Sequence, residues 1–296
     1  MKELNIINEI RKRAGASSKG VKIGIGDDCA VIRSGPGKYL LWATDMLIDG
    51  THFSAGKDGY RKIGRKAVSV NVSDIASMGG VPKYITVALG LPRGFSAGNI
   101  RKIYDGVFEI CEKYKIDVVG GDTNASGDLI IDISIIGSVE KKRLLTRRGA
   151  KKGDIIFVTG PVRDGKKEHL TFVPRLKEAR QLTLKYKINA MIDTSDGIAT
   201  DVSRICSESG KGCVLEEDKI PLSRGLALKD ALDYGESFEL LFTMSGKEAT
   251  RFKNNGDMKK LKCFKIGKIT DKRAGMRIVG AGGNKKVLVV DGFKHI

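Results

Sequence analysis

One short pattern recurs at separate places in the chain: a glycine or a strand-like end, with an aspartate next to a threonine. It occurs as ATDM around Asp45, as GGDT around Asp122 and as DTSDG from Asp193. A related loop, GIGDDC, places Asp27 and Asp28 side by side. A single such carboxylate is ordinarily a turn former or a helix N-cap. Turn chemistry does not explain the repetition, which favours a place built to hold cations.

Strand-like and helix-like segments mix throughout the 296 residues. The helix predicted after the N-cap Ser96 has apolar residues at i, i+3, i+4 and i+7, which give it one apolar stripe. Strand composition marks 39–44, 84–91, 117–119, 129–137, 154–159 and 238–242, and helical patterns mark 3–13, 61–78, 97–114, 174–187, 197–209 and 246–255. The glycine-rich segment 120–128 is expected to lie outside the strands.

The segment 139–153 is highly charged and has little apolar content, and the mixture of strands and helices restarts after it. We therefore expect two domains, 1–138 and 139–296, which fits the length of the chain. Both halves mix the two kinds of element, so the predicted fold class is α/β or α+β.

The charge of the chain is strongly positive, with 53 Lys and Arg against 35 Asp and Glu. The excess lies in two stretches: 138–188 has 15 basic against 5 acidic residues, and 247–296 has 14 against 4. Such stretches attract nucleic acid or phosphorylated small molecules, or they form a solvated lysine-rich surface. The basic runs lack interleaved aromatic residues and any nucleic-acid motif, so nucleic acid is not the expected partner.

Other features indicate the kind of protein. The sequence has no run of 18 apolar residues and no apolar segment near its beginning, so we expect neither a membrane span nor a secretory signal, and a cytoplasmic location. The five cysteines are widely spaced and form no CxxC pair, which favours small buried side chains over disulfides or zinc. They are Cys29, Cys111, Cys206, Cys213 and Cys263.

Two chemistries use many carboxylates: general acid–base catalysis and magnesium binding. The chain has only three histidines, so magnesium is the better interpretation and zinc or copper is disfavoured. Thr44, Thr123 and Ser195 could add hydroxyl groups. The pair Gly120-Gly121 allows backbone N–H groups to approach a phosphate. Neither the P-loop pattern nor the protein-kinase motif set is present.

A set of motifs in order resembles the thiamine-monophosphate kinase family, within the superfamily of aminoimidazole ribonucleotide synthetase. The motifs are GIGDDCAVI, TDMLIDGTHF, GRKAVSVNVSDIASMGGVP, GGDTN, RRGAKKGD, DTSDG, YGESFELLF and GFKHI. The resemblance covers nearly the whole chain. It implies two mixed α/β domains, a homodimer whose N-terminal strands form a shared barrel, and an ATP and Mg²⁺ site in the cleft between the domains. The implied reaction moves the γ-phosphoryl group of ATP onto thiamine monophosphate and gives thiamine diphosphate.

The resemblance also implies roles for individual residues, and it implies no catalytic base. Several Mg²⁺ ions would be bound by Asp27, Thr44, Asp45, Asp74, Asp122, Asp193 and Asp196, with Asp28 as a further candidate. The nucleotide would be contacted by Tyr104, Gly121, Asp122, Arg147 and Ser195, and the thiamine phosphate by His52, Glu236 and Phe293. Tyr104 also lies on the apolar stripe of its predicted helix, so core packing remains its alternative.

The chain departs from the family pattern at several positions. Ala43 stands where a serine is usual, Ser237 and Phe238 replace an aspartate and a tyrosine, and the segment after Thr159-Gly160 is basic rather than glycine-rich. The ending GFKHI, with Lys294 and Ile296, replaces GFDHF. Two other functions stay open: another ATP-using enzyme of the superfamily with a different phosphorylated substrate, and a basic nucleic-acid-binding protein.

Overall fold

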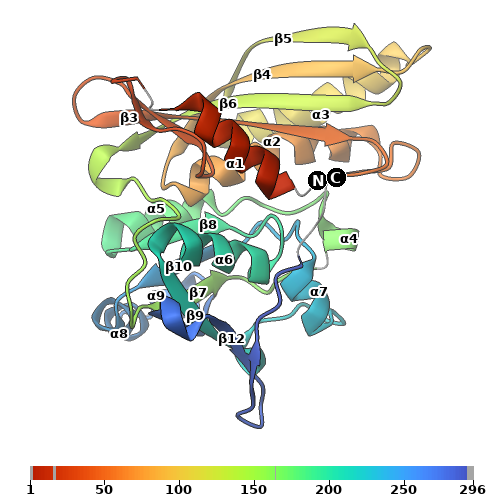
Figure 1. Ribbon diagram of the computed structural model, residues 1–296. Helices are drawn as coiled ribbons and strands as arrows, with labels where there is room; N and C mark the ends of the chain where they lie inside the picture. Colours follow the sequence, from red (N-terminus) through yellow and green to blue (C-terminus); the bar gives the residue numbers. More distant parts are fainter. Residues whose placement is uncertain (1–2, 16–17, 164, 292–296) are drawn as a thin grey trace.

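The computed structural model describes residues 3–15, 18–163 and 165–291, which fold into two α/β units (Figure 1). The first unit has a six-stranded sheet of order β1-β2-β3-β6-β4-β5, and the second has a seven-stranded sheet of order β13-β12-β9-β11-β7-β10-β8. Neighbouring strands are antiparallel except for the parallel pairs β4–β5 and β9–β12. The prediction of two mixed domains is confirmed.

The first unit contains α1 (Glu3–Ala14), β1 (Val21–Ile23), β2 (Ala30–Arg33), β3 (Lys38–Ile48), α2 (Tyr60–Ser77), β4 (Val81–Leu91), α3 (Ala97–Tyr114), β5 (Asp117–Ala125) and β6 (Ile130–Glu140). A 3₁₀ turn, η1 (Lys141–Arg143), follows. The second unit contains β7 (Ile155–Thr159), α4 (Gly165–Glu168), α5 (Leu176–Lys185), β8 (Ala190–Asp193), α6 (Ile198–Ser209), β9 (Lys211–Glu216), η2 (Glu217–Lys219), α7 (Leu228–Asp233), β10 (Leu240–Met244), α8 (Gly246–Asn254), α9 (Asp257–Lys260), β11 (Cys263–Asp271), η3 (Lys272–Ala274), β12 (Met276–Val279) and β13 (Lys285–Val287).

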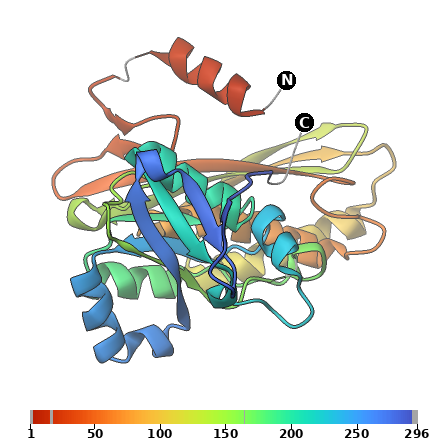
Figure 2. The ribbon, with the colours of Figure 1, turned by 60° about the horizontal axis from the view of Figure 1, so that its bottom comes forward.

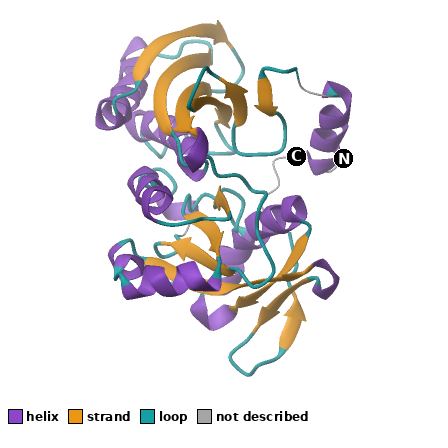
Figure 3. Ribbon diagram, turned by 90° about the vertical axis from the view of Figure 1, so that its left-hand side faces the viewer, coloured by secondary structure: helices purple, strands orange, loops and turns teal. Residues whose placement is uncertain are grey.

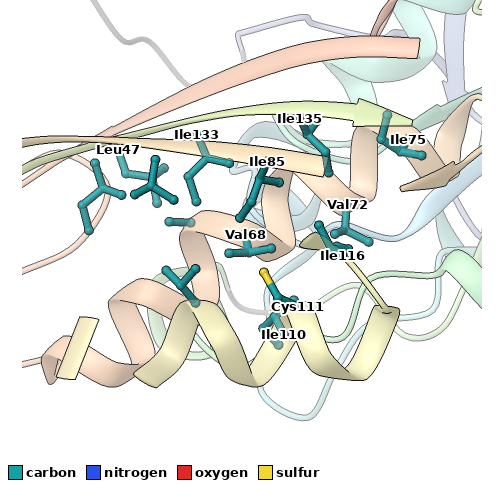
Figure 4. Packing of buried hydrophobic residues seen from close by; sticks show 14 of the residues in the cluster. Leu47, Val68, Val72, Ile75, Ile85, Ile110, Cys111, Ile116, Ile133 and Ile135 are labelled. Atoms are coloured by element: carbon teal, nitrogen blue, oxygen red, sulfur yellow. The ribbon is translucent and has the colours of Figure 1, made fainter. Parts of the chain in front are cut away.

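The core of the first unit lies between its sheet and the helix α2, with α3 packed on the other side of α2 (Figure 4). Ile85, Ile133 and Ile135 alternate along their strands so that each points at the helices, as a half-buried strand requires. The two helices approach very closely: a Cβ on Gly64 would lie 2.0 Å from the Ile103 carbonyl oxygen. Glycine at the contact between α2 and α3 therefore allows the two helices to pack closely. Helix α2 lies deep in the core, with 13 of its 18 residues buried.

The opposite face of the first sheet has no helix over it among the described residues (Figure 3). Trp42 and Met46 project from β3 onto this face with about half of their surface exposed, 51% and 53%. Helix α1 lies to one side, away from α2 and α3 (Figure 2). We call this exposed side of strands β3 to β6 the outer face.

The central strand β7 of the second sheet is buried on both faces. Along β7, Ile156 and Val158 belong to the cluster under α6, while Phe157 belongs to the cluster with α5 and α8. Phe157 stacks on Phe242 of β10 with ring centroids 5.4 Å apart. Ala76 of α2 belongs to this second cluster, so α2 is packed into the cores of both units.

The structure corrects one predicted loop. Gly120, Gly121 and Asp122 lie inside β5, whose residues pair with β4 in parallel register. A Cβ on Gly121 would lie 2.0 Å from the Val87 carbonyl oxygen of β4, so this glycine permits close strand packing. Glycine and aspartate disfavour strands, and the tertiary pairing overrides that preference.

Other expectations can be compared directly. Ser96 accepts a hydrogen bond from the backbone N–H of Asn99 and caps α3, as predicted. All five cysteines are buried with free thiols. No described helix is long and apolar enough to cross a membrane. The expected strand 238–242 is displaced to 240–244, because Glu236 and Phe238 have positive φ angles of 64° and 50° and cannot continue a strand.

Candidate functional site

A cavity of about 460 Å³ lies between the two units, and we call it the interdomain cleft. The first unit contributes the loop before β2, the middle of β3 and the buried side of α2, and the second contributes the loops after β8 and before β10. The predicted site residues that line it are Asp27, Thr44, Asp45, His52, Asp74, Arg147, Asp193, Ser195, Asp196 and Glu236, together with Asp28.

Helix α2 runs along the cleft and contributes residues to both of its ends. Lys66, Val70, Ser73, Asp74 and Ser77 follow one another at helical spacings of three, four or one residue, so they share one side of the helix. At 1.5 Å per residue, Lys66 and Asp74 are about 12 Å apart along the axis. One helix therefore reaches both ends of the cleft.

An acidic cluster occupies one end. Asp28, Asp74 and Asp193 each offer a carboxylate oxygen, and these oxygens lie within 4.8 Å of one another. Two serines of α2 orient the cluster: Ser73 donates a hydrogen bond to Asp193 and Ser77 donates one to Asp28, both at 2.5 Å. The three aspartates come from a loop, a helix and a strand end, so the fold itself assembles the cluster.

Burial of these carboxyl groups changes their acidity. Burial raises the pKa of Asp193 to about 8, and the charge of Asp28 adds to the effect. Burial and Asp28 raise the pKa of Asp27 to about 7, and burial raises that of Asp45 to about 6. Burial and Asp45 place the pKa of Asp74 well above its ordinary value. The cluster thus holds more negative charge than its surroundings offset, which suits a hard divalent cation with oxygen ligands.

Two arginines provide the nearest protein counter-charges. The guanidinium of Arg147 donates to one carboxylate oxygen of Asp28 through Nε at 3.0 Å and Nη2 at 2.6 Å. Arg204 pairs with Asp196 and with the buried Asp201. Burial opposes the charge of both arginines, but the aspartates raise the pKa of each. Arg204 was not among the predicted residues, although its i, i+3 spacing from Asp201 in a predicted helix was a signal for it.

A second polar cluster occupies the other end of the cleft. His52, in the turn after β3, accepts a hydrogen bond at Nδ1 from the Ile48 backbone N–H at 3.1 Å. The ammonium of Lys66 donates to the His52 carbonyl oxygen at 2.6 Å and also to the carboxylate of Glu236. Its third neighbour is Nδ1 of His169 at 2.8 Å. Lys66 and His169 were missed by sequence reasoning.

The loop that carries Glu236 lies directly against the aspartate loop after β8. The Glu236 backbone N–H donates to the Ser195 carbonyl oxygen at 2.8 Å, and a Cβ on Gly235 would lie 1.7 Å from that same oxygen. A glycine before Glu236 is therefore required for this contact. The YGESFE and DTSDG motifs begin at residues 234 and 193 and meet here in space.

Some predicted residues lie away from this cleft in the chain. Gly121 and Asp122 line a separate hollow of about 280 Å³ on the outer face, together with Asp132. Thr44 donates a hydrogen bond to Asp132 at 2.9 Å, so it links this hollow to the cleft. Tyr104 lies half-buried on α3, with its ring 6.0 Å from that of Phe108. Phe293, Lys294 and Ile296 lie outside the described residues.

Comparisons with known proteins agree with this arrangement. Residues 26–139 match the AIR synthase related protein, N-terminal domain, and residues 150–279 match the AIR synthase related protein, C-terminal domain. Thiamine-monophosphate kinase of Buchnera aphidicola subsp. Schizaphis graminum is 33% identical, over 99% of this chain and 98% of that protein. The chain belongs to the thiamine-monophosphate kinase family. The Bacillus subtilis member is 30% identical, over 100% of this chain and 99% of its own length.

Solved structures of the family have the same fold. A structure described as AaThiL complexed with AMPPCP and TMP has a TM-score of 0.85 and 30% identity, and the match covers 100% of this chain and 97% of that one. The Aquifex aeolicus thiamine monophosphate kinase structure has a TM-score of 0.79 with 28% identity, over 96% and 98% of the two chains. The Escherichia coli hydrogenase maturation protein HypE shares the fold at 20% identity, with a TM-score of 0.72 and coverage of 97% and 96%.

Proposed function

We propose that this protein phosphorylates thiamine monophosphate to thiamine diphosphate with ATP as the phosphoryl donor. The observation that carries the proposal is the interdomain cleft, with the Asp28–Asp74–Asp193 cluster at one end and the Lys66–Glu236 cluster at the other. The relative described as complexed with AMPPCP and TMP, and the names of the sequence relatives, supply the substrate pair.

The acidic cluster is suited to magnesium. Its donors are oxygens only and several are buried; burial, with the charge of neighbouring aspartates, raises the pKa values of Asp193 and Asp74. The residues of the cleft that would hold Mg²⁺ are Asp27, Thr44, Asp45, Asp74, Asp193 and Asp196, with Asp28 as a further candidate. Magnesium bound there would offset the charge of the two phosphate groups that must approach each other.

The chain's own residues have a limited task in this reaction. The acceptor is a phosphate that is already anionic near neutral pH, so its attack needs no general base. The work is to position two polyanions in line and to offset their charge. Arg147 reaches the acidic cluster from the segment between η1 and β7 and would contact a phosphate there. Ser195 lines the same part of the cleft.

The assembly is also part of this proposal. Gly121 and Asp122 lie on the outer face, and the exposed Trp42 and Tyr84 lie on the same side of the sheet. A second copy of the chain that covers this face through a barrel of N-terminal strands would bury these aromatic side chains. The homodimer and the cytoplasmic location stay predictions. The same holds for the nucleotide contacts of Tyr104, Gly121 and Asp122, and for the domain division near 138.

The test is an assay of the purified protein with ATP, Mg²⁺ and thiamine monophosphate, with separation and quantification of thiamine diphosphate. Thiamine and phosphorylated aminoimidazole-pathway compounds serve as alternative acceptors. We expect diphosphate formation from the monophosphate alone, and none without Mg²⁺. If another acceptor is phosphorylated while thiamine monophosphate is not, the substrate assignment is wrong and the protein is a different ATP-using member of its superfamily.

A further inference from the structure

A fully buried lysine lies beside the cleft, and no step above assigns it a role. Lys66 has 0% of its surface exposed, although lysine is among the residues least often buried. Its ammonium is enclosed by the His52 carbonyl oxygen at 2.6 Å, Nδ1 of His169 at 2.8 Å and the Glu236 carboxylate. Burying an ammonium costs free energy, and the pairing that offsets this cost adds little net stability. Stability alone therefore does not explain the arrangement.

Two of the neighbours of Lys66 belong to the cleft. Glu236 and His52 line the cleft, whereas Lys66 lies behind them. Asp58 is the other acid close enough to affect the ammonium, and the neutral imidazole of His169 faces both Lys66 and Glu236, the latter at 3.4 Å. Lys66 therefore contacts the two residues that are expected to bind the acceptor, and it lies behind them, away from the cleft.

Glu236 needs such a support because its backbone is strained. Its φ angle is 64°, in the left-handed region that is rarely adopted by residues other than glycine. Phe238, two residues later, has a φ angle of 50°. Strained residues persist only where their surroundings hold them, and they concentrate at binding sites. The ion pair with Lys66 and the backbone bond to Ser195 are among the contacts that hold Glu236 in place.

An aromatic wall lies next to this carboxylate. Phe238 stacks on Phe172 with ring centroids 4.2 Å apart and planes 16° apart, and Val70 of α2 packs against both. Phe238 and Val70 line the cleft. A flat apolar surface beside a fixed carboxylate suits a positively charged aromatic ring, because the ring can lie on the phenyl group while its charge faces the carboxylate.

We propose that Lys66 is a positioning residue that holds Glu236 and the His52 turn in the geometry that receives the cationic heterocycle of the acceptor. The proposal rests on the proposed function, because thiamine monophosphate is the acceptor that carries a thiazolium ring. Lys66 makes this contact from α2, the same helix that places Asp74 in the acidic cluster about 12 Å away. The spacing of two residues on one helix thus sets the distance between the heterocycle end and the phosphoryl-transfer end of the cleft.

The test compares Lys66→Met, Glu236→Gln and the double variant in the intact protein. The readouts are KM for thiamine monophosphate, KM for ATP, kcat, and the dissociation constant of thiamine monophosphate from calorimetry without ATP. We expect Lys66→Met to raise the KM and the dissociation constant for thiamine monophosphate by about tenfold or more, with KM for ATP changed less than about twofold. The double variant should bind no more weakly than the weaker single variant, since both changes disturb one contact.

Controls separate positioning from general stability. Arg175→Met breaks another buried ion pair, with Glu239, which does not line the cleft. It should lower the melting temperature and leave both KM values unchanged. If Lys66→Met does not fold, Lys66→Gln takes its place, because glutamine keeps a hydrogen-bond donor without the charge. We expect it to raise the KM and the dissociation constant for thiamine monophosphate in the same way as Lys66→Met.

Two results would overturn the inference. One is a folded Lys66 variant whose affinity for thiamine monophosphate is unchanged. The other is an equal rise of both KM values, as in a merely loosened protein. The wild-type protein reports separately on the proposed function: if it neither binds nor phosphorylates thiamine monophosphate, that function is wrong and the role of Lys66 falls with it.

Discussion

Asp74 is the residue on which the account of the acidic cluster depends most. It lies between Asp45 and Asp193, and burial together with Asp45 raises its pKa well above the ordinary value. Replacement by Asn keeps the shape and removes one charge. We expect Asp74→Asn to stabilise the metal-free protein, because it removes repulsion from a buried group. We also expect it to lower turnover by more than about a hundredfold, because a metal ligand is lost.

Thermal unfolding with and without Mg²⁺, beside the turnover assay, checks this prediction. Mg²⁺ should raise the melting temperature of the wild-type protein, since a ligand that binds only the folded state stabilises it. The increase should shrink in Asp74→Asn. Asp218→Asn, an exposed change in η2, is the matched control. Near-normal turnover of Asp74→Asn at saturating Mg²⁺ would contradict the magnesium assignment.

Two of the residues that sequence reasoning missed, Lys66 and Arg204, are cations that lie wholly or largely out of solvent. A lysine in a helix sequence usually indicates a solvated position, so Lys66 attracted no attention. Its partners His169 and Glu236 are 103 and 170 residues away along the chain. Asp45 and Asp193 could be found because they follow strands in a repeated pattern, and that pattern is local, whereas Asp74 was assigned through the family motifs.

At the scale of elements, the close crossing of α2 and α3 sets the position of the site. A Cβ on Gly64 would lie 2.0 Å from the Ile103 carbonyl oxygen, and one on Gly106 would lie 1.9 Å from that of Arg61. We expect Gly64→Ala and Gly106→Ala each to lower the free energy of unfolding by about 1–3 kcal/mol or more, because the helices must separate. Gly98→Ala, near the start of α3, should be neutral or stabilise by about 0.5–1 kcal/mol.

Chemical denaturation of the three glycine variants tests this expectation. Equal effects of Gly64→Ala and Gly98→Ala on the free energy of unfolding would contradict it, because of these two glycines only Gly64 faces a backbone atom within contact distance. Since α2 carries Asp74, the Gly64 variant should also weaken Mg²⁺ binding. Such crossings are hard to read in a sequence, because glycine inside a helical pattern lowers the local preference for helix.

The strand β6 is tied to α5 of the second unit by an ion pair. Arg180 holds the Glu140 carboxylate through two nitrogens at 2.8 and 2.9 Å, and its hydrogen bond lowers the pKa of Glu140 from 4.5 to about 2. A lowered pKa means that the folded state favours the carboxylate. The stabilisation is therefore fully present above pH 4.5 and is lost as the pH falls toward 2.

Glu140→Gln should lower the free energy of unfolding by about 1 kcal/mol at neutral pH, as expected for a partly exposed ion pair with good geometry. The difference from wild type should shrink when unfolding is measured at about pH 3. Glu248→Gln, which removes an exposed pair with Arg251 on α8, should cost less at either pH. A difference for Glu140→Gln that does not depend on pH would show that the ion pair is not its cause.

At the scale of the whole molecule, the division into two mixed units was predictable, because strand and helix patterns restart after a charged segment. The strand at 120–125 was not predictable, because its glycines and aspartate adopt the strand conformation only through pairing with β4. The sequence also could not indicate which aspartates share one cavity. Asp122 matches the same repeated pattern as Asp45 and Asp193, yet within one chain it lies on the outer face.

The outer face leads to a prediction about assembly. If a second copy covers it, Trp42→Asp and Tyr84→Asp would place a charge in an apolar contact and yield monomers. Light scattering should then report twice the chain mass for wild type and a single chain mass for these variants. Val287→Asp, a change at a still more exposed apolar residue on β13 of the second unit, should leave the mass unchanged. A monomeric wild-type protein would contradict the predicted homodimer.

The central claim is that the cleft transfers the γ-phosphoryl group of ATP directly to the phosphate of thiamine monophosphate. The most direct measurement is a phosphorus NMR time course of the protein with ATP, Mg²⁺ and thiamine monophosphate. The account predicts that the γ-phosphate signal of ATP falls while ADP and thiamine diphosphate appear in equal amounts, without free phosphate. Formation of AMP with the diphosphate, or of ADP and free phosphate while thiamine monophosphate persists, would contradict it.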